Sequence, residues 1–228
     1  MLLIFDLDDT LIYTHRVFMQ LTRQFLERMA CLGFDDENVY YTLDSIDREI
    51  VESEDAYVPW AFPAAMQRTY QFYCEKYFVP YDEYEAAALA DLGSSFREAD
   101  YQLLPGAKPL LDVLNAAGHI LVLLTQGDYE VQNFKVRQHN LGQYFDEIIV
   151  VNKKTEEVYN SIMRLHGLAP QDTAVIGNSL KSEVAQALAV GARAILLTAA
   201  EGWQFEDEEV SGDYAVARTL AEVPELLR

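Results

Sequence analysis

The chain has 228 residues, half of them apolar, and a formal net charge of −20. That size and composition allow one large domain, or a core domain with a smaller companion, and exclude a disordered chain. The acidic balance argues against nucleic acid as a partner, because phosphate backbones are bound by clustered lysine and arginine side chains.

The two cysteines, Cys31 and Cys74, have no metal-ligand or redox spacing, so we expect core thiols in a reducing compartment. Acidic residues follow directly after the apolar residues 1–5, and we therefore expect no signal peptide. No apolar stretch approaches the length of a membrane span. These features predict a cytoplasmic protein without membrane contact, present as a monomer or a homodimer.

The first predicted element is a buried strand at residues 2–5, a short apolar run that stops at Asp6. From His15 to Phe96 the apolar residues instead recur at helical spacing, and no strand pattern is found. Four stripes mark this block: Val17, Leu21, Phe25 and Met29; Val39, Leu43, Ile46 and Ile50; Met66, Tyr70, Tyr73 and Tyr77; and Tyr84, Leu92 and Phe96. They predict a small helical bundle.

Strands and helices alternate after residue 106, which predicts a parallel sheet covered by helices on both faces. The predicted strands are residues 120–124, 148–151, 174–176, 194–197 and 214–216. The predicted helices are residues 108–117, 129–141, 155–165, 182–190 and a last one that runs through Leu227. Trp203 follows the fifth strand, and the acidic residues 206–209 are expected to form a solvated loop.

Because the strand at residues 2–5 is expected to join the same sheet, the helical block is an insertion. We predict a doubly wound, Rossmann-like α/β core at residues 1–14 and 103–228, with an all-helical domain at residues 15–102. The chain then passes between the domains near residues 11–15 and 101–105, which are candidate hinges.

Polar side chains follow four of the predicted strands, at the edge where doubly wound sheets bind their ligands. The segments are Asp6-Leu7-Asp8-Asp9-Thr10, Thr125-Gln126-Gly127-Asp128, Asn152-Lys153-Lys154 and Gly177-Asn178-Ser179 with Glu183 beyond it. A phosphoryl transfer site needs a nucleophile, a divalent cation and donors for the phosphoryl oxygens. These strand ends contain residues for each part, and Asp9 is expected to cap a turn.

The same segments resemble the four motifs of the haloacid dehalogenase-like hydrolases: DLDDT at 6–10, LLTQGD at 123–128, the lysine at 153 or 154, and VIGNSLKSE at 175–183. The resemblance covers the whole chain, including a helical cap between the first two motifs and the run LLPGAKPLLDVLNAAG at 103–118. It implies a magnesium-dependent phosphatase that hydrolyses a small phosphorylated metabolite through an aspartyl-phosphate intermediate.

The resemblance also implies a role for each motif residue. Asp6 would attack phosphorus, and Asp8 would protonate the leaving oxygen and later activate water. The lysine would neutralise charge on the nucleophile and the phosphate. The expected phosphate-binding groups are Thr125, the backbone amides of Gln126 and Gly127, and the lysine; the expected Mg²⁺ ligands are Asp6, the Asp8 carbonyl, Asn178 and, directly or through water, Glu183.

Two positions depart from the family pattern: Asn178 stands where many relatives have Asp, and Glu183 where Asp is usual. The spacing from Tyr159 favours Lys154 over Lys153 as the active lysine. Two other functions stay open. A 2-haloacid dehalogenase needs no acid at position 8, which makes Asp8 surplus. A binding or regulatory protein without activity is kept open by Asn178 and Glu183.

Overall fold

The computed structural model describes residues 1–199 and 210–228. It divides into two compact units, one made of Met1–His15 with Tyr101–Arg228 and the other of Arg16–Asp100. The predicted loop at residues 206–209 and the position of Trp203 lie outside the described residues. That the helical unit acts as a cap stays a prediction.

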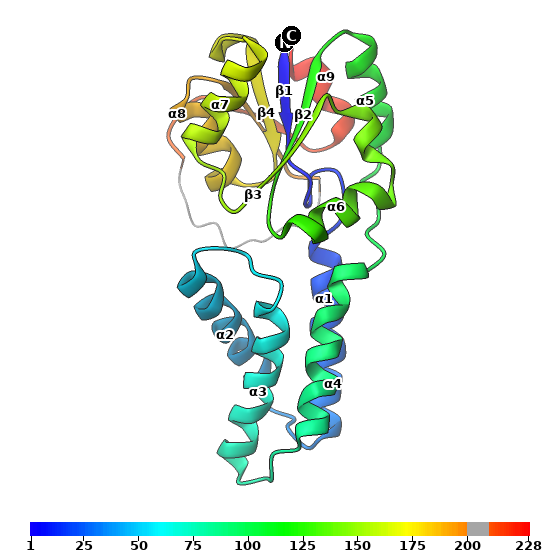
Figure 1. The fold of residues 1–228 in the computed structure, drawn as a ribbon, viewed down its shortest axis with the longest axis vertical. Helices are drawn as coiled ribbons and strands as arrows, with labels where there is room; N and C mark the ends of the chain where they lie inside the picture. Colours follow the sequence, from blue (N-terminus) through cyan, green and yellow to red (C-terminus); the bar gives the residue numbers. More distant parts are fainter. Residues whose placement is uncertain (200–209) are drawn as a thin grey trace. The chain divides into compact units, whose positions relative to one another are not determined.

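The first unit is built on a parallel sheet, as its alternation of strands and helices predicts. In the described residues the sheet has six strands in the order β3-β2-β1-β4-β5-β6 (Figure 1). The strands are β1 (Leu2–Phe5), β2 (Ile120–Gln126), β3 (Glu147–Val151), β4 (Thr173–Gly177), β5 (Arg193–Leu197) and β6 (Ala215–Ala217). The strand order reverses between β1 and β4, so these neighbours frame the expected ligand edge.

Helices cover both faces of this sheet (Figure 1). Helices α7 (Glu156–His166) and α8 (Gln186–Ala189) contact each other, as do α5 (Ala107–Ala116) and α9 (Val223–Leu226). Tyr159 and Ile162 of α7 pack in one buried cluster with Leu2, Ile4 and Val122 of the strands. Helix α6 (Tyr129–Gln138) follows β2 and contacts β3. The fold is therefore the predicted doubly wound α/β sheet.

Two helices of this unit differ from the predicted ones. The helix expected at residues 182–190 begins two residues earlier with a wide π-helical turn, Leu180–Ala185, and continues as α8. Such turns are often found at functional sites. The predicted C-terminal helix is a 3₁₀ turn, Leu220–Glu222, followed by the short α9.

The second unit contains four α-helices within its described residues: α1 (His15–Cys31), α2 (Val39–Glu54), α3 (Ala61–Tyr77) and α4 (Glu83–Ser94), with a 3₁₀ turn at Ser95–Glu98. Aromatic rings fill its interior, with Phe18 and Phe62 5.2 Å apart in an edge-to-face pair. Two tyrosines of the predicted stripes do not lie in the interior, because Tyr84 is 90% exposed and Tyr77 is 48% exposed. The buried residues of α4 are Ala86, Leu89 and Gly93, and Gly93 lies against Pro63 of α3.

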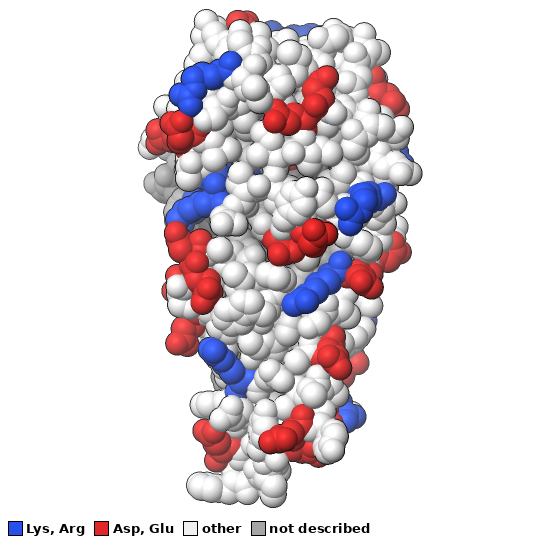
Figure 2. All heavy atoms as spheres, viewed as in Figure 1, with Lys and Arg blue, Asp and Glu red and all other residues white. Residues whose placement is uncertain are grey.

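Charged side chains are scattered over the face drawn in Figure 2, with basic and acidic residues interspersed. No single basic patch is seen on that face. Among the residues that the structure describes, no helix is both long enough and apolar enough to cross a membrane.

Candidate active site

Asp6 sits at the reversal of strand order, directly after β1. Leu2 and Ile4 point to the α7 side of the sheet, and the two-residue period of a strand carries Asp6 to the same side. Its backbone N–H donates to the Ile176 carbonyl of β4 at 3.0 Å, which prolongs the strand pairing by one residue. The carboxylate is therefore buried and held by the edge of the sheet.

Lys154 is the lysine that the structure brings to Asp6. Its Nζ lies 2.5 Å from Asp6 Oδ1 and 2.7 Å from Glu183 Oε1, and its side chain is buried, whereas Lys153 is exposed. Burial alone would lower the pKa of Lys154, but the charges of Asp6 and Glu183 raise it further than burial lowers it. The lysine is therefore charged, as a group that neutralises a nucleophile and a phosphate must be.

Glu183 is a partner of this lysine in the structure. Its Oε1 accepts from Lys154 and its Oε2 accepts from the Ser179 backbone N–H at 2.8 Å. The approach depends on Gly177, because a Cβ there would lie 2.3 Å from Glu183 Cγ. Burial raises the pKa of Glu183 to about 7, against the opposing charge of Lys154. Both oxygens are thus already engaged, and the role of Glu183 as a metal ligand stays a prediction.

Asp8 is held by three other side chains. Its Oδ1 accepts from Lys135 Nζ at 2.7 Å and from the Thr14 hydroxyl, and its Oδ2 accepts from Gln132 Nε2 at 2.7 Å. Burial by itself would raise the pKa of Asp8, but the Lys135 charge and these hydrogen bonds lower it below its usual value. The carboxylate is therefore ionised in this arrangement.

Thr125, the sixth residue of β2, is fully buried, and its Oγ1 accepts from Gln132 Nε2. Because that oxygen already accepts a hydrogen bond, its own proton is left to donate elsewhere. The Gly127 N–H donates to the Val151 carbonyl at 3.0 Å, so in this structure Gly127 pairs β2 with β3, and its role in phosphate binding stays a prediction. Its φ of 141° is a conformation that glycine readily adopts.

Asn178 follows β4 and shares a hydroxyl with Asp6. Thr10 Oγ1 lies 3.0 Å from Asp6 Oδ2 and 3.4 Å from Asn178 Oδ1. One hydroxyl proton serves only one of these two acceptors at a time, so two oxygens converge with a single donor between them. This pairing fits a hard cation, which prefers carboxylate and amide oxygens.

The charge balance also fits a cation. Burial is the largest influence on Asp6 and raises its pKa, although Lys154 offsets part of the effect. Among the residues that the structure describes, Asp6, Asp8 and Glu183 pair with two buried lysines, Lys135 and Lys154. In the described part of the chain no three His, Cys, Asp or Glu side chains form a metal cluster, so a cation here would be held by Asp6 together with Asn178, a backbone carbonyl and water.

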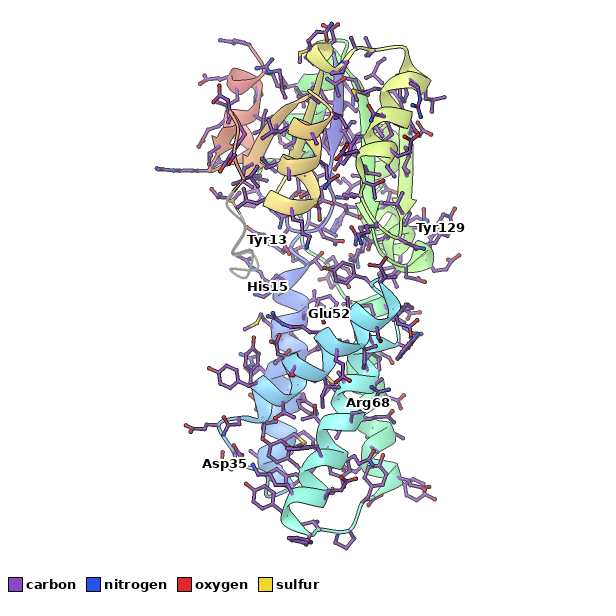
Figure 3. All side chains as sticks on the ribbon, turned by 90° about the vertical axis from the view of Figure 1, so that its left-hand side faces the viewer. Tyr13, His15, Asp35, Glu52, Arg68 and Tyr129 are labelled. Atoms are coloured by element: carbon purple, nitrogen blue, oxygen red, sulfur yellow. The ribbon has the colours of Figure 1, made fainter. Side chains whose placement is uncertain are left out.

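Asp9 caps the start of the chain's first helix, as expected of a cap residue. Its Oδ1 accepts from the backbone N–H of Thr14 at 2.9 Å and of His15 at 3.0 Å, and His15 begins α1 (Figure 3). Its own φ of 52° tightens the turn after Asp8. Asp9 thereby fixes the turn through which the chain leaves the strand end and enters α1.

Two site residues, Gln132 and Lys135, were not foreseen from the sequence. They lie on α6, which begins at Tyr129 (Figure 3), and both are buried. With Val131 and Val136 they form one face of the helix at positions i, i+1, i+4 and i+5. Two polar residues on an otherwise apolar helix face can be recognised in the sequence, and this pattern could have indicated that they belong to the site.

Comparisons with known proteins identify the family and the fold of the chain. The chain is 24% identical over 198 residues to a glyceraldehyde 3-phosphate phosphatase of Pyrococcus abyssi, covering 84% of this chain and 78% of the relative. It is 28% identical over 127 residues to a phosphoserine phosphatase of Thermus thermophilus, covering 53% of this chain and 50% of the relative. A haloacid dehalogenase-like family hydrolase of Xanthomonas campestris has the same fold, with a TM-score of 0.80, 22% identity, and coverage of 98% of this chain and 92% of that one. The family model of the haloacid dehalogenase-like hydrolases matches residues 1–191, and the chain therefore belongs to this family.

Proposed function

We propose that this hydrolase is a magnesium-dependent phosphatase that acts on a small phosphorylated metabolite through an aspartyl phosphate on Asp6. The observation that carries the proposal is the surroundings of Asp6. Lys154 Nζ contacts one carboxylate oxygen and the Thr10 hydroxyl contacts the other, and the same hydroxyl also lies near Asn178 Oδ1. Relatives named as phosphatases of glyceraldehyde 3-phosphate and of phosphoserine support the substrate class.

In the first step Asp6 attacks phosphorus, the bond from phosphorus to the ester oxygen breaks, and that oxygen takes a proton from Asp8. The Thr125 hydroxyl and the Lys154 ammonium stabilise the charge on the transferring group. Because the Asp8 pKa is lowered in the free enzyme, Asp8 has to take up a proton as the substrate binds.

In the second step water attacks the aspartyl phosphate and gives its proton to Asp8, and inorganic phosphate leaves Asp6 free. The ionised Asp8 of the structure is the form that this step requires. A dehalogenase has no need of an acid at this place, because halide leaves without a proton. Asp8, held by Lys135 and Gln132, therefore favours phosphoryl transfer.

The residues that would hold the metal are Asp6, the Asp8 carbonyl and Asn178, with Glu183 through water. Bound magnesium would neutralise charge on the phosphoryl oxygens. The chain's own contribution is to keep the Asp6 and Asn178 oxygens on neighbouring strand ends, close to one hydroxyl group.

The test is phosphate release from a panel of phosphorylated metabolites with Mg²⁺, including glyceraldehyde 3-phosphate and phosphoserine. Asp6→Asn keeps the size of the side chain but removes the nucleophile, so turnover should fall by at least about a thousandfold while the fold is kept. Trapping of a phosphorylated protein after acid quench should be lost in the same variant. Substantial turnover by Asp6→Asn on any ester of the panel contradicts the mechanism.

The metal has its own test. Activity should disappear with excess chelator and return with Mg²⁺. Asn178→Asp should keep activity at a lower Mg²⁺ requirement because it adds a charge at the same reach, and Asn178→Ala should raise the requirement. If the natural protein is inactive on the panel and Asn178→Asp gains turnover, the natural protein is instead a binding protein. Full activity in chelator contradicts the metal and reopens the dehalogenase reading.

A further inference from the structure

Helix α6 places two buried polar side chains against the active site. Gln132 and Lys135 are one turn apart, with 2% and 4% of their surfaces exposed. Lys135 binds Asp8 Oδ1 and Gln132 binds Asp8 Oδ2, each at 2.7 Å. Gln132 also donates to the Thr125 hydroxyl oxygen. One turn of helix thus contacts both oxygens of the acid/base carboxylate and a phosphate-binding hydroxyl.

Lys135 is itself held from a second direction. Its ammonium lies 4.9 Å from the centre of the Tyr101 ring, a cation–π contact with a buried tyrosine. Tyr101 is tied to the end of the same helix, because its N–H donates to Gln138 Oε1 at 3.0 Å and its carbonyl contacts His139 Nε2. The lysine is therefore clamped between the aromatic ring and the Asp8 carboxylate.

A structural role alone does not account for this arrangement. Burying a lysine is costly, and an apolar side chain of the same volume at position 135 would pack without that cost. The Lys135 charge offsets the effect of burial on the Asp8 pKa. What the clamp adds is a fixed direction for both oxygens of Asp8, next to the Thr125 hydroxyl that would bind the phosphoryl group.

We propose that Lys135 and Gln132 are positioning residues for the reaction, which set the orientation of the Asp8 carboxylate and, through Gln132, the direction of the Thr125 hydroxyl proton. This inference depends on the proposed phosphatase function. It assigns α6 a part in proton transfer, although neither side chain touches the reacting atoms. The effect should therefore be seen in the steps that use Asp8 and should depend on Asp8.

The experiment compares two esters in single-turnover kinetics. An alkyl phosphate needs a proton on its leaving oxygen, whereas p-nitrophenyl phosphate has a leaving group that departs without one. Lys135→Met keeps the length of the side chain but removes the charge and the donors. Formation of the aspartyl phosphate from the alkyl ester should slow by about tenfold to a hundredfold, with KM within about twofold, because small misplacement of a reacting group is costly. Formation from p-nitrophenyl phosphate should slow much less.

Three further variants complete the design. Lys135→Arg keeps a charged donor and should restore most of the rate. Arg137→Met removes a charge from the exposed face of the same helix and should match the natural protein. In an Asp8→Asn background, Lys135→Met should have little further effect, because residues that act through one group are not additive. Thermal unfolding reports the fold, and Lys135→Gln replaces the methionine variant if that one does not fold.

Equal slowing on both esters, or a full additional loss in the Asp8→Asn background, would overturn the positioning role. So would unchanged kinetics of Lys135→Met in a natural protein that hydrolyses both esters. If the natural protein releases phosphate from neither ester, the proposed function fails and the positioning role fails with it.

Discussion

The two units of the chain use their charged residues differently. In the α/β unit, Lys154 pairs with Asp6 and Glu183, and the three side chains are 3%, 7% and 3% exposed. In the helical unit, Lys76 pairs with Asp36, and their side chains are 40% and 12% exposed. Exposed pairs contribute little to stability, whereas buried charges cost desolvation energy that the pairing has to offset. The α/β unit therefore keeps a costly arrangement that only its chemistry explains.

The interiors of the two units also differ in the side chains that fill them. The strands of the α/β unit bury aliphatic side chains such as Leu2, Ile4 and Val122 around the polar edge. The helical unit packs rings on rings, with Phe34 about 6 Å from Tyr70 and from Tyr73. It also leaves Phe78 95% exposed. Stability in that unit comes from aromatic burial, so changes to its ion pairs should matter less than changes to the ion pairs of the α/β unit.

The largest effect is expected at the buried cluster. Lys154→Met would leave Asp6 and Glu183 buried without their counter-charge, and we expect the free energy of unfolding to fall by about 3–5 kcal/mol. Phosphatase activity should be lost as well. Urea unfolding followed by circular dichroism measures the first effect. A variant as stable as the natural protein would show that the Lys154 charge does not offset the burial of Asp6 and Glu183.

A smaller effect is expected from Gly177→Ala. The new methyl group would lie 2.3 Å from Glu183 Cγ and would push that carboxylate away from Lys154. Overpacking of this kind costs about 1–3 kcal/mol, and kcat should fall because the lysine loses a partner. Gly167→Ala is a suitable control, since a Cβ there meets nothing within 4 Å, although its φ of 62° carries its own strain. Equal effects of the two substitutions on kcat would contradict the close-approach argument.

A stabilising change is expected in the helical unit, at Asp47 of α2. Burial raises the pKa of Asp47 from 3.8 to about 6, and in the described residues no group donates a hydrogen bond to its Oδ1. Between these two values the folded state binds more protons than the unfolded state, so stability falls as pH rises through that window. Asp47→Asn should stabilise the protein by about 1–2 kcal/mol at pH 7, allowing for solvent screening, and by almost nothing near pH 4. A gain that is the same at both values would exclude the titration of Asp47 as its cause.

The smallest effect is expected at Lys76→Met. Hydrogen bonds from Lys76 and Asn38 hold the pKa of Asp36 well below its usual range, but the pair is more exposed than the pairs of Lys154. We expect a change in unfolding free energy far below that of Lys154→Met, and one that shrinks further in salt. Unfolding measured at low and high ionic strength checks it. A loss comparable to that of Lys154→Met would remove the contrast between the units.

Short-range patterns determined much of this protein from the sequence alone. The apolar run that ends at Asp6, the later alternation of strands and helices, and the helical spacing of the inserted block specify the doubly wound sheet and its insertion. Polar residues at strand ends are brought to one edge by any parallel sheet, which is why Asp6, Thr125 and Asn178 could be named beforehand. These inferences depend only on periods of two and 3.6 residues and on where each run stops.

The tertiary structure decided which of the named groups meet. Lys154 rather than Lys153 reaches Asp6, because the loop after β3 turns only one of two adjacent side chains inward. The Gly127 amide is taken by the Val151 carbonyl of the neighbouring strand. Lys135 lies 127 positions from Asp8 along the chain, and only the docking of α6 brings their side chains to 2.7 Å. Contacts of this kind depend on how helices and strands pack against one another. The local sequence pattern of a helix or strand does not specify which side chains of another element it will meet.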